Sequence, residues 1–89
     1  MKAIVTVVGK DQVGIIAAVC TQLAQANVNV QDISQTVMQG YFTMMMVTEF
    51  SEDSCDVAEL SRRLEQTGKE LGISVRVQRE EIFNAMHRV

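Results

Sequence analysis

The stretch VVGKDQVGII, residues 7–16, contains the junction that decides the fold. Before it, residues 2–8 are β-branched and almost continuously apolar, which is typical of a central strand covered on both faces. After it, from Gly14 to Ala26, apolar residues recur at helical spacing, with Ile16, Val19, Cys20 and Leu23 on one face. The sequence therefore predicts a strand that Gly9 ends, a polar loop, and a helix.

Residues 28–39 are predicted to form a polar strand at an edge of the sheet. Their apolar residues change phase near Gln31 and Asp32, which indicates either a β-bulge at that point or a strand that begins only after it. Gly40 then predicts a tight hairpin turn into a second apolar strand, residues 41–50.

A second helix is predicted over residues 57–71. Ser54 and Asp56 are candidate N-caps, Asp56 stands in capping-box spacing to Glu59, and Gly72 is the predicted C-cap. After it, residues 73–78 alternate as a final strand, with three apolar residues facing inward: Ile73, Val75 and Val77.

The order βαββαβ predicts an α+β fold of the ferredoxin-like type, an antiparallel sheet in the order 4-1-3-2 with both helices on one face. The domain is expected to span residues 1–79. Residues 80–89 carry apolar residues at helical spacing and are predicted to form a short C-terminal helix as an extension. Because two helices cover one face, we expect a second chain, the 80–89 helix, or both to cover the other.

Composition narrows the class of protein. Apolar residues make up 47% of the 89 residues, enough for one core, and the net charge is −3, with scattered lysines and arginines that do not suit nucleic-acid binding. No signal peptide is evident, and no apolar run approaches the roughly 18 residues of a membrane span. Cys20 and Cys55 form no metal or disulfide motif. We therefore expect a cytoplasmic protein.

Residue chemistry argues against several functions that this fold hosts. An iron–sulfur cluster needs four thiolates, and a soft-metal chaperone needs paired cysteines in the first loop. An acylphosphatase-like enzyme needs an arginine in that loop. RNA-recognition domains stack bases on aromatic residues of both central strands, and residues 2–8 contain none. The loop has the glycine spacing of a P-loop, but Ile15 and Ile16 replace its essential Lys and Ser/Thr.

Catalysis is not predicted either. His87 has no evident partner, and Cys55, near the start of a predicted helix, is a weak candidate nucleophile. We therefore expect a non-catalytic protein without a cofactor or a metal ion.

The stretch VTVVGKDQVGIIAAVCTQLAQANVNVQDISQ, residues 5–35, resembles the opening of an ACT domain, a small regulatory module of amino-acid metabolism. The resemblance covers residues 2–79. The segments YFTMMMVTEF and EEIFNAMHRV resemble a bacterial group of stand-alone single ACT domains, which are distantly similar to glycine-cleavage transcriptional regulators.

The resemblance implies that the first loop binds an amino acid. Backbone N–H groups at the helix start suit a carboxylate, and the side chain of Asp11 suits an ammonium group. The loop residues implied are Lys10, Asp11, Gln12, Val13, Gly14 and Ile15. The resemblance also implies that a second subunit completes the site with the start of its second strand, at Asn29, Gln31, Asp32 and Ile33.

The residues alone leave an alternative open. In this alternative these residues have structural roles alone and bind no ligand. Asp11 caps the helix, Gly14 packs it against the sheet, and the polar strand residues protect an edge from aggregation. The predicted function is a homodimeric regulatory module that binds an amino acid or a related metabolite. The alternatives are an interaction adaptor with a vestigial pocket, which docks an unidentified protein, and an enzyme that uses Cys55.

Overall fold

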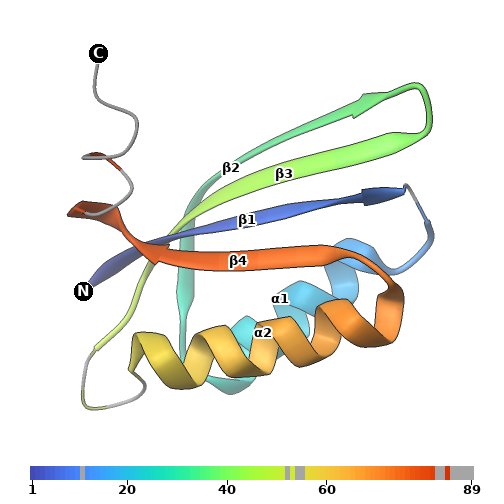
Figure 1. The fold of residues 1–89 in the computed structure, drawn as a ribbon. Helices are drawn as coiled ribbons and strands as arrows, with labels where there is room; N and C mark the ends of the chain where they lie inside the picture. Colours follow the sequence, from blue (N-terminus) through green and yellow to red (C-terminus); the bar gives the residue numbers. More distant parts are fainter. Residues whose placement is uncertain (11, 52, 54–55, 82–83, 85–89) are drawn as a thin grey trace.

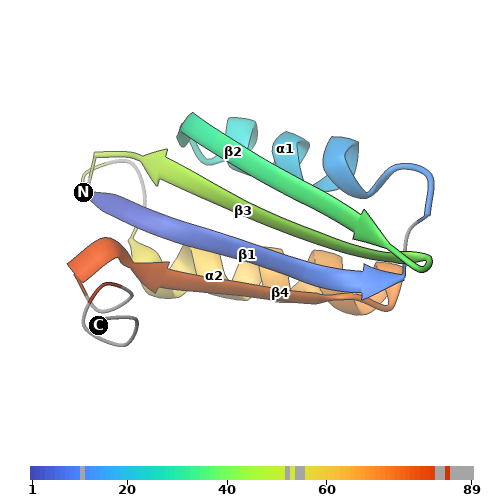
Figure 2. The same cartoon turned by 90° about the horizontal axis from the view of Figure 1, so that it is seen from above.

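The computed structural model describes residues 1–10, 12–51, 53, 56–81 and 84. Its elements are β1 (Lys2–Lys10), α1 (Ile15–Gln25), β2 (Asn29–Met38), β3 (Tyr41–Glu49), α2 (Val57–Leu71) and β4 (Ser74–Arg79). The strands form one antiparallel sheet in the order β2-β3-β1-β4. Both helices lie against the same face of it (Figures 1 and 2). The predicted ferredoxin-like sandwich is confirmed, with the polar strand at an edge.

The core lies between the helices and the sheet. Alternate residues of the central strands are buried there, and aliphatic side chains of both helices and of β4 pack on them. The largest fully buried side chains are those of Val5, Val7, Val19, Leu23, Met44, Met46, Thr48, Leu60 and Leu64. Valine, leucine and methionine thus fill most of the space, with Phe42 and Phe50 as the aromatic members of the core.

The apolar stripe of α1 differs from the prediction. Ile15, Val19 and Leu23 face the core, whereas Ile16 is 40% exposed and Cys20 is half-buried. Positions 15, 19 and 23 are four residues apart and lie in one row along the helix, and this row faces the sheet. The prediction that Ile16 lies on the apolar face with Val19 and Leu23 was therefore wrong.

Gly9 does not end the first strand, contrary to the prediction. It pairs with Phe42 of β3, and Lys10 pairs with Tyr41, so β1 runs to Lys10. A Cβ atom at Gly9 would lie 2.5 Å from Cγ2 of Ile73. Glycine is therefore required here for close packing of the strand end, because any side chain would collide with Ile73.

The irregular features of β2 agree with the sequence. The pairing of β2 with β3 shifts register between Val30 and Asp32, and the strand already begins at Asn29, so the first of the two predicted alternatives, the bulge, is confirmed. Gln39 and Gly40 connect the two strands with φ angles of 52° and 82°. Two successive positive φ angles are the signature of a type I′ hairpin, the connection that matches the twist of paired strands.

The ends of α2 are also as predicted. The side chain of Asp56 accepts a hydrogen bond from the backbone N–H of Glu59 at 2.7 Å, and Gly72 ends the helix in the left-handed conformation. The N–H of Ile73 then donates to the carbonyl of Gly68 at 2.9 Å. This 6→1 bond is that of a Schellman motif.

The sheet face opposite the helices, called the open face below, is only partly covered. Val8, Tyr41 and Met45 are 44%, 57% and 38% exposed on it. Glu80, Glu81 and Asn84 are helical, but the remaining residues of the predicted C-terminal helix lie outside the described residues. Among the described residues, neither helix is long and apolar enough to cross a membrane.

Candidate ligand-binding site

The loop between β1 and α1 lies at the end of the sheet where β1 ends. Gly14, which has no side chain, is the N-cap of α1, with a φ angle of 93°. The first bond of the helix runs from the N–H of Ala18 to the carbonyl of Gly14 at 2.9 Å. The N–H groups of Ile15, Ile16 and Ala17 therefore have no partner within the helix, and such groups attract anions.

The space over Gly14 is open. A Cβ atom added there would meet no described atom within 4 Å, so this glycine does not pack the helix against the sheet. Its positive φ angle explains why glycine is favoured, because other residues rarely adopt that conformation. The packing alternative for Gly14 therefore has no support in the geometry.

The other loop residues have distinct environments. Lys10 is exposed at the end of β1, and Asp11 lies outside the described residues. The Nε2 of Gln12 donates to the carbonyl of Leu71 at 2.8 Å and so ties the loop to the end of α2. Val13 is fully exposed, whereas Ile15 is buried in the core.

The second group of predicted site residues lies at the opposite end of the sheet. Asn29 pairs with Glu49, which also pairs with Lys2 at the start of β1. Lys10 lies eight residue steps along the extended strand from Lys2, roughly 26 Å at about 3.3 Å per residue. One chain therefore does not bring the loop and the start of β2 together.

Two local hydrogen bonds form at the start of β2. The Nε2 of Gln31 donates to Oε2 of Glu49 at 2.9 Å, and Oδ1 of Asp32 accepts the N–H of Ile33 at 2.9 Å. Ile33 is 45% exposed at the sheet edge. Among the described residues, no three His, Cys, Asp or Glu side chains come together as a metal site.

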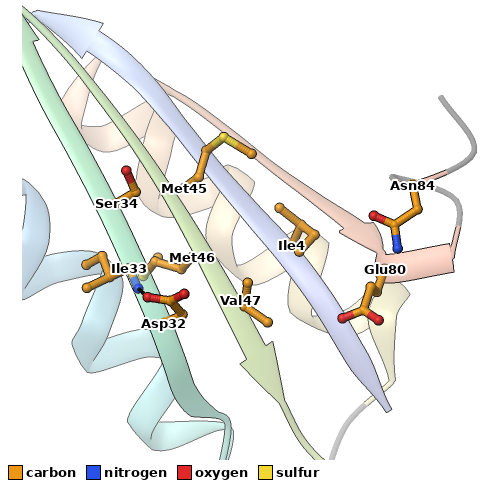
Figure 3. Close-up of a pocket in the computed structure, with 9 residues that line it drawn as sticks. All are labelled: Ile4, Asp32, Ile33, Ser34, Met45, Met46, Val47, Glu80 and Asn84. Atoms are coloured by element: carbon orange, nitrogen blue, oxygen red, sulfur yellow. Dashed lines mark hydrogen bonds between the residues drawn. The ribbon is translucent and has the colours of Figure 1, made fainter. Parts of the chain in front are cut away.

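A groove that the sequence did not indicate lies on the open face (Figure 3). Its volume is about 410 Å³. Apolar residues of the central strands and polar residues from both sides line it: Ile4, Asp32, Ile33, Ser34, Met45, Met46, Val47, Glu80 and Asn84. Only strand register brings Asp32 and Glu80 to one surface, so spacing along the sequence could not find it.

The fold and the site define a class of protein. It is a small α+β module in which a four-stranded ferredoxin-like sheet carries two helices on one face. The open N-terminus of α1 is a candidate site for an anionic ligand group. Residues 2–78 match the model of the ACT domain family. The chain therefore belongs to the ACT domain family, whose members are generally regulatory, ligand-binding modules.

Similar proteins support this assignment over the whole chain. A UPF0237 protein from Bifidobacterium longum is 54% identical over 88 residues, which cover 99% of this chain and 98% of that protein. The solved structure of an ACT domain protein from Streptococcus pneumoniae is 44% identical, with a TM-score of 0.81 and 93% of each chain covered.

A more distant likeness shows the fold alone. The crystal structure of a putative glycine cleavage system transcriptional repressor has a TM-score of 0.78 at 23% identity, covering 88% of this chain and 44% of that one.

Cys55 and His87, the catalytic candidates considered from the sequence, lie outside the described residues.

Proposed function

We propose that this chain is a cytoplasmic, non-catalytic regulatory module that senses an amino acid or a related metabolite as a homodimer. The observation that carries the proposal is the start of α1: three N–H groups without helical partners, with open space above Gly14. Membership of the ACT domain family supports a regulatory, ligand-binding role.

The loop suits both charged groups of an amino acid. The α-carboxylate accepts hydrogen bonds from the N–H groups of Ile15 to Ala17, where the positive end of the helix dipole favours an anion. Asp11, three residues before Gly14 in the sequence, supplies a carboxylate for the α-ammonium group.

The second half of the site comes from a partner subunit in this proposal. β2 is an edge strand, so a copy related by a two-fold axis can pair with it in antiparallel fashion. Antiparallel pairing reverses the partner strand and sets the start of β2 in one chain beside the β1–α1 loop of the other. The residues Ile33 and Val37, 45% and 56% exposed, would lose exposed area in this dimer.

A thermal-shift screen of the twenty amino acids tests this function. A ligand at ten times its Kd stabilises the folded state by about 1.4 kcal/mol. For a domain of this size that raises the Tm by roughly 5–10 °C. Asp11→Asn should abolish the shift, whereas Asp53→Asn, an exposed carboxylate before α2, should leave it unchanged.

The second candidate is an interaction adaptor with a vestigial pocket, and one observation favours it. The open face exposes Val8, Tyr41 and Met45, a set of apolar side chains suited to contact with another protein. If no amino acid shifts the Tm at millimolar concentration, the adaptor function is favoured over amino-acid sensing.

A further inference from the structure

The groove on the open face has an apolar floor between two acidic sides. Asp32 pairs with Val47, Val47 with Ile4, and Ile4 with Gln78, so one row of residues crosses all four strands. Paired residues point to the same face of an antiparallel sheet. Glu80 follows two residues after Gln78, and Figure 3 shows Asp32 and Glu80 on opposite sides of Val47 and Ile4.

Within the described part of the chain, neither carboxylate forms an ion pair within 4 Å, and Lys2 and Arg79 lie with Glu80 around a neighbouring pocket rather than in this groove. Oδ1 of Asp32 accepts a backbone N–H, and the ion pair near the groove joins Arg79 to Glu81 at 3.8 Å rather than to Glu80. None of the residues that line the groove is a lysine, an arginine or a histidine. The groove therefore presents two negative charges to an occupant. The side chain of Asp32 is exposed, and that of Glu80 is half-buried.

We propose that this groove binds an aliphatic diamine, a molecule with two ammonium groups joined by a short methylene chain. Each ammonium group donates to one carboxylate, and the methylene groups lie on Ile4, Met45 and Val47. The hydroxyl of Ser34 and the carboxamide oxygen of Asn84 can accept the remaining N–H groups.

The width of the sheet sets the length of the ligand. Two strand spacings of about 4.8 Å separate Asp32 from Ile4, and Glu80 lies beyond Ile4 on the other side. Three strand spacings, about 14 Å, therefore lie between the positions of the two carboxylates, because Glu80 directly follows β4. Ammonium–carboxylate bonds of about 2.8 Å at both ends leave about 9 Å when the side chains stand upright and less when they lean over the groove, a length that about four to six methylene groups fill. An amino acid fits poorly, because its carboxylate would lie beside Asp32 or Glu80. The groove is therefore distinct in chemistry from the loop at the start of α1.

Calorimetric titration of the full chain with 1,4-diaminobutane at low ionic strength tests the proposal, with 1-aminobutane as the control ligand. The diamine should bind at least tenfold more tightly than the monoamine, because only it reaches both carboxylates. Asp32→Asn and Glu80→Gln should each weaken diamine binding about tenfold and make the two amines bind equally. Glu70→Gln removes the charge of an exposed side chain on α2, away from the groove, and should change the affinity less than twofold.

Three results would overturn the proposal: equal binding of the two amines to the unaltered protein, an equal loss in Glu70→Gln, or no binding at millimolar concentration. The substituted carboxylates belong to exposed or half-buried side chains, and unchanged thermal melts of the variants show that they remain folded. Asp32 belongs to both proposed sites, whereas Glu80 belongs to the groove alone, so the result for Glu80→Gln separates failure of the groove from failure of the amino-acid site.

Discussion

Gly9→Ala tests how closely the end of β1 is packed, and with it the position of the loop that follows. The new Cβ atom would lie 2.5 Å from Cγ2 and 2.9 Å from Cβ of Ile73, which is only 9% exposed. Overpacking of this kind destabilises by about 1–3 kcal/mol. Replacement of a strand glycine returns about 0.5–1 kcal/mol. We therefore expect a net loss of about 1.5 kcal/mol, or roughly 6–12 °C in Tm.

Urea unfolding of a double-mutant cycle isolates this contact. Ile73→Leu keeps the side-chain volume and removes the branch at Cβ, so in its background Gly9→Ala should cost at least about 1 kcal/mol less. Gly40→Ala is the control: its φ angle is 82°, nothing described lies within 4 Å, and Ile73→Leu should not relieve its cost. A Gly9→Ala variant as stable as the original protein, or a cost that Ile73→Leu leaves unchanged, would refute the packing argument.

Three further predictions concern single hydrogen bonds. Asp56→Ala should lower the free energy of unfolding by about 1 kcal/mol, because the N–H of Glu59 loses its acceptor; a urea midpoint that does not move would contradict this. Thr48→Val should cost about 1 kcal/mol, because the buried Oγ1 donates to the carbonyl of Ala3 at 2.9 Å, and calorimetric melting measures the loss. Gln12→Ala should cost about 0.5–1 kcal/mol through its bond to Leu71, and hydrogen exchange should increase at the start of α1; unchanged exchange there would show that the bond does not hold the loop.

The fold was largely predictable because local signals agree with one another. The change of phase at Gln31 and Asp32 located the bulge, Gly40 located the hairpin, and Asp56 with Gly72 marked both ends of α2. These features depend on residues close in the sequence, so a reading of the sequence alone can find them.

The errors arose where distant segments decide the outcome. A glycine after an apolar run indicates the end of a strand, and Gly9 was interpreted in this way. Ile73, 64 positions later in the sequence, lies so close that only glycine fits at position 9. Ile15 and Ile16 both fit a helical repeat with Leu23, and only packing on the sheet selects Ile15.

The candidate site was predictable in kind but not in layout. The loop and its glycines are contiguous, whereas strand register shows that Asn29 lies at the far end of the sheet from Lys10. The groove with Asp32 and Glu80 depends wholly on that register. Composition and motif spacing contain no information on it.

Calorimetry of mixed variants tests the central claim, a loop site completed by a partner subunit, most directly. Gly14→Val alters the loop half and Asn29→Ala the β2 half, and the amino acid with the largest thermal shift serves as ligand. Each variant alone should show no binding. After exchange of subunits, a mixed dimer contains one site with both halves intact, so about a quarter of all sites should bind with the original affinity. A mixture that stays silent, or an Asn29→Ala protein that binds fully by itself, would contradict the shared site.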